Sequence, residues 1–327
     1  RGNMTITSRR GFDPFRRQTT AALAVYLALL SLAELAVIYL SPVLVFPLHG
    51  GLIALVAIYV ALHSDAERHD PTHVALFMVL VLGPLIRIIS LTLPLGQIDP
   101  AYRYLFAGVP MAVAAFVAVR ATGLRWRDVG MRWTAWHWQV AVILAAIPIG
   151  FIEFAVLRPE PIGPPAWTPG GILPALSLGF FTGFPEELIF RGVMQTVTRP
   201  FFGRWNWIYV AAIFAVLHIG YMSYIDVVFV FGAGLLFGWV FERTRSIIGV
   251  SISHGLANVV LFFVAPHLID LEGVPLLGPQ LQYSVGVASV IGIAVAGYFI
   301  SSSVLAESRR RRRAASRGSR TTPSANL

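Results

Sequence analysis

Three clusters of polar residues lie within stretches of the sequence that are otherwise apolar enough to cross a bilayer. The clusters are Glu186-Glu187 with Arg191, Phe214 with His218, and His254 with Asn258. A charged side chain at the centre of a bilayer costs at least about 2.5 kcal/mol on insertion scales. Several such groups in successive spans therefore predict a functional site that faces the interior of the protein.

The first cluster offers two carboxylates with different expected roles. Adjacent residues on a helix diverge by about 100°, so Glu186 and Glu187 point in different directions. Glu187 and Arg191 are four residues apart and share one face, which favours an ion pair. Glu187 is then held ionised by Arg191, and Glu186 is left to point at a reaction centre. An ion-paired packing device without catalytic purpose is the alternative for this cluster.

The other two clusters repeat a spacing of four residues. Phe214 precedes His218 by one helical turn, and a lone histidine in an apolar helix is more often a hydrogen-bonded core residue than a ligand. His254 and Asn258 project from one stripe of a further apolar segment. A histidine and an asparagine on one stripe can both donate hydrogen bonds to a single oxygen, which is what an oxyanion site requires.

These clusters can meet only if they lie at similar depths in the membrane. Counted from the expected cytoplasmic ends at about 1.5 Å per residue, Glu186 lies ~17 Å deep, His218 ~18 Å and His254 ~11 Å. The levels overlap. A carboxylate, two imidazoles and an amide in one cavity can hold a water, deprotonate it and stabilise a tetrahedral oxyanion. We therefore expect hydrolysis of a peptide bond within the membrane.

The composition describes a polytopic membrane protein with an all-α fold. The chain has 327 residues, of which 56% are hydrophobic and 13% charged, and its mean hydropathy is +0.71. Runs long enough to cross ~30 Å of hydrocarbon predict about ten membrane helices, within a range of about eight to ten. They lie near residues 19–40, 43–63, 73–96, 102–120, 137–157, 172–197, 206–222, 224–241, 247–266 and 282–304.

The positions of the basic residues predict the topology. All 25 are Arg, and most gather near residues 1–17, 68, 120–132, 199–204, 243–245 and 309–320. Because Arg collects in short cytoplasmic loops, these segments are expected to be cytoplasmic. An even number of spans with both termini in the cytoplasm fits this pattern.

The net charge of +9 does not indicate nucleic-acid binding. The excess lies in the C-terminal tail and in loops beside the membrane rather than on a folded basic face. These arginines are expected to orient the protein and to contact anionic headgroups of the lipid bilayer. With no cysteine in the chain, disulfides, iron–sulfur clusters, thiolate zinc sites and cysteine nucleophiles are excluded.

The three motifs, in this order, resemble those of the CPBP intramembrane proteases, also called the CAAX prenyl protease 2, Rce1-like or Abi family. The family signature is E-E-x-x-x-R, then F-x-x-x-H, then H-x-x-x-N on successive helices. The chain matches it at Glu186-Glu187-Arg191, Phe214-His218 and His254-Asn258. The resemblance covers roughly residues 172–266, and the first five spans carry no motif.

The resemblance implies an intramembrane endopeptidase with a conical cavity that faces the cytoplasm. Glu186 would act with His218 to activate the attacking water, while His254 and Asn258 would form the oxyanion hole. Glu187 and Arg191 would support the site, with Glu187 as a second acid or base. Phe214 is a supporting residue.

The cofactor is left open. Glu186, His218 and His254 together make a plausible Zn²⁺ set, so the resemblance allows a metalloprotease. The sequence contains no H-E-x-x-H pair on one helix, and water activated by a glutamate alone is the other reading.

On this basis the chain divides into four segments. A cytoplasmic N-terminal segment covers residues 1–18, and N-terminal transmembrane helices cover 19–171. A catalytic CPBP-type transmembrane core covers 172–304, with the motifs within 183–258. A basic, disordered cytoplasmic tail covers 305–327.

Other polar residues in the apolar spans are expected to have structural roles. Glu34 and Arg87 are expected to form a structural ion pair, and Glu153, toward the far side of its span, is not assigned to catalysis. Gly234 and Gly238 predict a close helix contact.

The expected substrate is a membrane-anchored or lipidated peptide or protein. The absence of Lys with heavy Arg and Ala use favours a multi-pass protein of a bacterial plasma membrane. Two other function classes remain. A non-catalytic scaffold or bacteriocin-immunity-like relative would keep the fold without needing the full set of motif residues. A transporter would also bury ionisable groups, but it usually shows internal repeats or paired broken helices.

Overall fold

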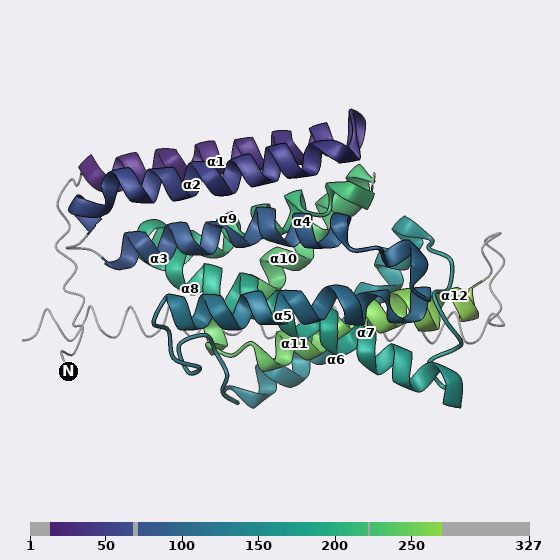
Figure 1. The fold of residues 1–327 in the computed structure, drawn as a ribbon. Helices are drawn as coiled ribbons and strands as arrows, with labels where there is room; N and C mark the ends of the chain where they lie inside the picture. Colours follow the sequence, from purple (N-terminus) through teal and green to yellow (C-terminus); the bar gives the residue numbers. More distant parts are fainter. Residues whose placement is uncertain (1–13, 68–70, 222, 270–327) are drawn as a thin grey trace, which may run out of the picture.

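The computed structural model describes residues 14–67, 71–221 and 223–269, and it is built from helices (Figure 1). The α-helices are α1 Pro14–Tyr39, α2 Val45–Glu67, α3 Pro71–Leu80, α4 Leu82–Thr92, α5 Arg103–Ala121, α6 Trp136–Leu157, α7 Pro169–Glu187, α8 Gln195–Phe202, α9 Asn206–Val216, α10 Tyr224–Thr244, α11 Ile248–Val259 and α12 Ala265–Leu268. Two π-helical segments, Leu188–Met194 and Val260–Val264, continue α7 and α11. The expected all-α fold is confirmed.

Eight helical stretches of the described chain are long and apolar enough to cross a membrane. They are Ala21–Tyr39, Pro42–Leu62, Val74–Thr92, Pro100–Ala121, Trp136–Leu157, Pro169–Phe202, Tyr224–Thr244 and Ile248–Leu268. This number falls within the expected range. The last expected span, 282–304, and the tail at 305–327 lie outside the described residues, as does most of 1–18.

One expected span is wrong. The run at 206–222 forms only a short helix, α9, which ends at Val216. The chain then turns through His218, because His218 N donates to the carbonyl of Ala215 and the helical pattern stops there. Apolar character alone did not reveal this turn, since the residues on both sides of it are hydrophobic.

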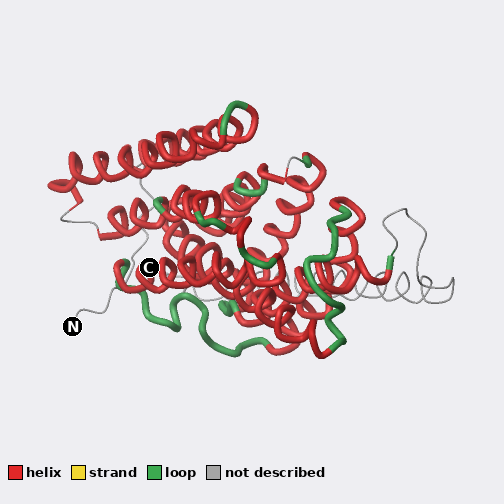
Figure 2. The backbone as a smooth tube through the Cα atoms, turned by 45° about the vertical axis from the view of Figure 1, so that its right-hand side comes forward, coloured by secondary structure: helices red, strands yellow, loops and turns green. Residues whose placement is uncertain are grey.

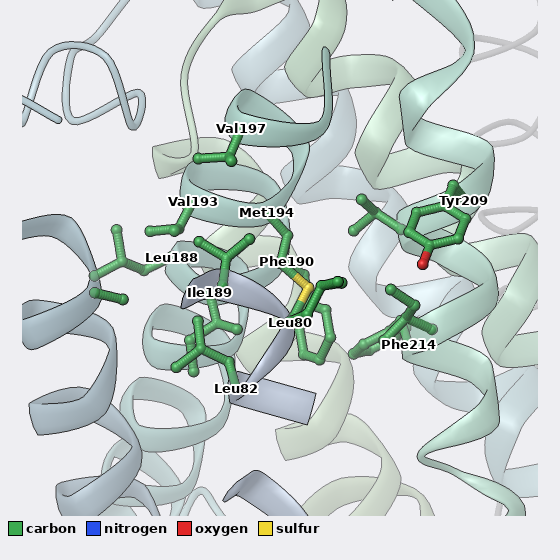
Figure 3. Close-up of a cluster of buried hydrophobic side chains, with 14 of the residues drawn as sticks. Leu80, Leu82, Leu188, Ile189, Phe190, Val193, Met194, Val197, Tyr209 and Phe214 are labelled. Carbon is green, nitrogen blue, oxygen red and sulfur yellow. The ribbon is translucent and has the colours of Figure 1, made fainter. Parts of the chain in front are cut away.

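The helices run broadly along one direction, with α1 and α2 as a pair at one side of the bundle (Figures 1 and 2). Helix α11 packs against both α6 and α7, and α10 packs against α9. Large apolar side chains around the π-helical segment, among them Leu188, Phe190 and Met194, form a core together with Leu80 and Phe214 (Figure 3). A second apolar cluster, which includes Leu178 and Leu261, packs α7 against the π-helical continuation of α11.

Glycines bring α7 and α11 into backbone contact. A Cβ added at Gly255 would overlap the carbonyl of Gly179, and a Cβ at Gly183 would overlap the carbonyl of Ser251. Small residues at a crossing allow such close approach in membranes, where packing rather than the hydrophobic effect drives helix association. The predicted contact at Gly234 and Gly238 is also present, because these glycines pack against Ala211 and Trp207 of α9.

A buried ion pair joins the N-terminal helices. Arg87 Nη2 lies 2.7 Å from Glu34 Oε2, which confirms the predicted pairing. His49, which the sequence did not single out, adds a third member, with its Nε2 3.5 Å from Glu34 Oε1. Glu34 and His49 are both completely buried.

Replacing Gly255 by Ala tests the α7–α11 contact. The added methyl group must push the two backbones apart, and overpacking of this kind costs about 1–3 kcal/mol. We expect a lower midpoint when the detergent-solubilised protein is heated and its monodisperse fraction is followed by size-exclusion chromatography. Gly232→Ala on α10 is the matched control, because its Cβ would meet no atom within 4 Å. Equal midpoints for the two variants would contradict the close contact.

Candidate active site

The Glu-Glu-Arg cluster sits where α7 changes into a π-helix. Pro185 lies inside the last turn of α7, and the π-helical segment begins directly after Glu187. A proline has no backbone N–H, so it cannot make the hydrogen bond of a regular helix. Turns of π-helix are frequent at functional sites. Arg191 Nη1 donates to Glu187 Oε1 at 3.0 Å. The predicted pairing of Glu187 with Arg191 is therefore confirmed.

Arg191 ties together three elements from a fully buried position. Only 1% of Arg191 is exposed. Its Nη2 donates to the carbonyl of Gly234 on α10 at 3.2 Å, and its Cζ lies 4.7 Å from the ring centre of Phe214 on α9. Its charge is thus matched by a carboxylate, a carbonyl dipole and an aromatic face.

His254 lies between the two carboxylates. Its Nδ1 is 2.9 Å from Glu187 Oε1, and its Nε2 is 3.8 Å from Glu186 Oε2. The Glu187 side chain is completely buried, whereas the Glu186 side chain keeps 20% of its surface exposed. The two glutamates therefore differ in environment, as their divergence on the helix predicts.

His218 occupies the turn after α9, and a backbone contact orients its ring. Its Nδ1 lies 2.8 Å from the carbonyl of Phe214. Because a carbonyl can only accept, Nδ1 carries the proton, and Nε2 of the neutral ring is an acceptor. The Phe214 ring lies 4.6 Å from the His218 ring and 5.9 Å from the His254 ring, so Phe214 packs between the two histidines.

Asn258 is oriented by a threonine that the sequence analysis missed. Asn258 Nδ2 donates to Thr182 Oγ1 at 2.9 Å, and Thr182 Oγ1 donates to the carbonyl of Leu178 at 2.8 Å. Thr182 lies one helical turn before Glu186, and this spacing was the available signal. An asparagine amide has two N–H groups, so one donor remains for another acceptor.

One cavity collects most of the motif residues. Its volume is about 60 Å³, and Glu186, Phe214, His218, His254 and Asn258 all line it. A polar cavity of this size can hold a few waters. Glu187 and Arg191 do not line it and lie behind Glu186 and His254, in the buried core.

Glu153 of α6 also lines this cavity. Its sequence position suggested only a structural role toward the far side of its span. The close packing of α6 on α11, where Gly150 faces Ala257 and Val260, brings it to the same cavity as Glu186. An isolated ionisable residue in an apolar span was the available signal.

The cavity extends toward one end of the bundle. Tyr104, Leu157 and Phe262 line it, and Tyr104 and Leu157 lie at the ends of α5 and α6 that are away from the Arg-rich loops at 120–132 and 243–245. Toward those loops, buried side chains such as Arg191, Gln195 and Phe241 fill the interior. If the Arg-rich loops are cytoplasmic, the cavity extends away from the cytoplasm. The resemblance, in contrast, implies a cavity that faces the cytoplasm.

The motif residues do not assemble the zinc set that the sequence left open. Among the described residues, no three His, Cys, Asp or Glu side chains are arranged to hold a metal ion. His254 Nδ1 is engaged by Glu187, and His218 Nδ1 faces a backbone carbonyl. Such Nδ1 contacts are also usual for metal-ligating histidines, so the misfit rests on placement: Glu186, His218 and His254 do not form a metal-binding group among the described residues.

Comparisons with known proteins place these motifs in a family. Residues 166–260 match the family model described as type II CAAX prenyl endopeptidase Rce1-like. No curated protein and no solved structure matches the chain. The matched segment contains Glu186, His218, His254 and Asn258 in the expected order. The match of segment 166–260 thus supports the resemblance to the Rce1-like, CPBP family of CAAX-type membrane proteases.

Proposed function

We propose that the protein is an intramembrane endopeptidase that hydrolyses a peptide bond with a water activated by Glu186 and His218. One observation carries this proposal: Glu186, His218, His254 and Asn258, from two helices and one turn, line a single small polar cavity. The eight apolar helices and the family model that matches residues 166–260 support an integral membrane protein, as the proposal requires.

The attacking water would be held between Glu186 and His218. The Glu186 carboxylate accepts a proton from the water, while Nε2 of His218 accepts a hydrogen bond from it and fixes its direction. The hydroxide oxygen then bonds to the carbonyl carbon of the substrate, and the carbonyl π electrons move to its oxygen. Collapse of this intermediate breaks the C–N bond, and Glu186 returns its proton to the departing amine.

Asn258 and His254 would stabilise the oxyanion. Asn258 keeps one N–H for the substrate oxygen, because Thr182 accepts the other. His254 can donate from Nε2 only when both ring nitrogens carry protons, since Nδ1–H faces Glu187. In that form one N–H binds Glu187 and the other points to the side of Glu186 and the cavity. Glu187 and Arg191 would thus act by orienting His254.

The family model supports a substrate class, and the position of the cavity supports a route of access. We propose a membrane-anchored or lipidated peptide or protein whose scissile bond reaches the cavity from the end of the bundle away from the Arg-rich loops. By the positive-inside rule this end is extracytoplasmic. A bacterial plasma membrane stays a prediction from composition.

Glu186→Gln tests the role of the carboxylate. The amide cannot take a proton from water, so we expect cleavage to fall by at least about 100-fold. The assay is cleavage of a panel of membrane-anchored and C-terminally lipidated peptides in liposomes. Glu160→Gln, at an exposed position in the loop after α6, is the matched control. Full activity of the Glu186 variant would refute the mechanism. Retained cellular function in a variant that does not cleave peptides would favour the non-catalytic scaffold.

Removing divalent metal ions tests the alternative chemistry. Because the donor set does not fit a metal centre, we expect the rate of peptide cleavage to be unchanged after treatment with EDTA or 1,10-phenanthroline. Activity that is lost on chelation and restored by added Zn²⁺ would instead establish a metalloprotease.

The side of access can be measured because the chain contains no cysteine. Leu157→Cys places a thiol at the end of α6 that is away from the Arg-rich loops, and Phe229→Cys places one at the cavity wall. Arg125→Cys places a thiol in the Arg-rich loop at 120–132. We expect a membrane-impermeant maleimide to label the first two in intact cells and Arg125→Cys only after permeabilisation. The reverse pattern would place the cavity on the cytoplasmic side.

A further inference from the structure

Among the motif residues, His218 is the one that stands outside a helix. Helix α9 ends at Val216, and α10 begins at Tyr224. The other motif residues lie on α7, α9, α11 or the π-helical segment. A turn has fewer internal hydrogen bonds than a helix, so its geometry depends more strongly on what packs against it.

Arg87 of α4 packs against this turn. A Cβ added at Gly220 would lie 2.8 Å from Arg87 Nη2 and 3.3 Å from Nη1. The guanidinium group therefore lies directly on the backbone of Gly220, two residues after His218. Only a residue without a side chain leaves room for this contact.

Arg87 is itself fixed by buried partners. Its Nη2 is 2.7 Å from Glu34 Oε2 on α1. The Nε2 atom of His49 on α2 is 3.5 Å from Oε1 of the same carboxylate. Removing one member of a buried ion pair costs several kcal/mol, because the other charge is left unpaired. A carboxylate of α1 thus pairs with the guanidinium of α4, and His49 of α2 lies beside that carboxylate.

The N-terminal helices also bind both sides of the turn. Tyr209 on α9 donates from its hydroxyl to the carbonyl of Leu23 on α1 at 2.9 Å. At the other end of α1, the hydroxyl of Tyr39 lies 2.7 Å from that of Tyr224, the first residue of α10. Helix α1 therefore contacts the element before the turn and the element after it.

We propose that Arg87 is a positioning residue for His218, and that α1, α2 and α4 serve to hold the His218-bearing turn through the Glu34–Arg87–Gly220 contact. This gives a purpose to spans that carry no family motif. Its consequence for turnover rests on the proposed hydrolysis. The positioning itself can be measured without a substrate.

Four variants distinguish an ion pair that only stabilises the fold from one that also positions His218. Gly220→Ala adds one methyl group against the guanidinium and leaves both charges in place. Gly51→Ala on α2 is the matched control, because its Cβ would meet no atom within 4 Å. Arg87→Met removes the charge, and Arg87→Lys keeps the charge but loses the planar fork.

The first readout is the rate of peptide cleavage in liposomes. For Gly220→Ala and Arg87→Met we expect kcat to fall by about 10- to 100-fold with KM unchanged, because misplacing a catalytic group by about 1 Å affects the chemical step. Arg87→Lys should retain an intermediate kcat, and Gly51→Ala should match the wild type.

The second readout is the rate at which diethyl pyrocarbonate modifies His218, measured by mass spectrometry with the exposed His137 as internal reference. We expect the His218 rate to rise in Gly220→Ala and Arg87→Met and to stay constant in Gly51→Ala. If Arg87→Met does not fold, Gly220→Ala still decides the matter.

Unchanged kcat and an unchanged modification rate in Gly220→Ala would overturn the proposal. A fall in kcat with an unchanged modification rate would also overturn it, because the loss would then arise away from His218. A raised modification rate in a protein that cleaves no peptide would support the positioning role and count against the proposed hydrolysis instead.

Discussion

The buried charge of Glu187 is the constraint on which the site depends. A carboxylate with no exposed surface must be matched by nearby donors, since an unpaired buried charge costs several kcal/mol. Arg191 and His254 supply those donors at 3.0 and 2.9 Å. Because the two donors come from the π-helical segment and α11, satisfying one charge joins two elements. It also leaves His254 facing Glu186, and so one side chain belongs both to the buried ionic cluster and to the cavity wall.

Close backbone packing makes this arrangement possible. The glycines at positions 179, 183 and 255 let α7 and α11 approach until their backbones touch. Side chains from the two helices can then meet across the crossing, as Thr182 and Asn258 do at 2.9 Å. In a bilayer, lipid competes with apolar side chains for contact, so packing of small residues is an efficient way to fix a crossing. The cavity beside this crossing has a volume of about 60 Å³, which is room for a few waters.

Two buried ionic clusters therefore contact different parts of the same candidate site. The Glu187–Arg191 pair supports His254 from within the matched segment. The Glu34–Arg87 pair reaches the turn after His218 from the N-terminal helices. The first follows from a motif of the family, whereas the second involves residues outside the segment that the family model matches. A site on a short core can thus depend on helices that carry none of its motifs.

The sequence alone was enough to predict a membrane protein, an all-α fold and most of the residues that line the cavity. Apolar runs and the spacings of four residues are local properties, and they led to Glu186, His218, His254 and Asn258, to the Glu187–Arg191 pair and to the pairing of Glu34 with Arg87. Tertiary structure decided where α9 ends, that Thr182 orients Asn258, that Glu153 reaches the cavity, and that Arg87 lies on Gly220. These facts depend on helix crossings and on contacts between distant residues, which no spacing within one segment encodes. The direction in which the cavity extends is of the same kind, because it depends on which side chains fill the space at each end of the bundle.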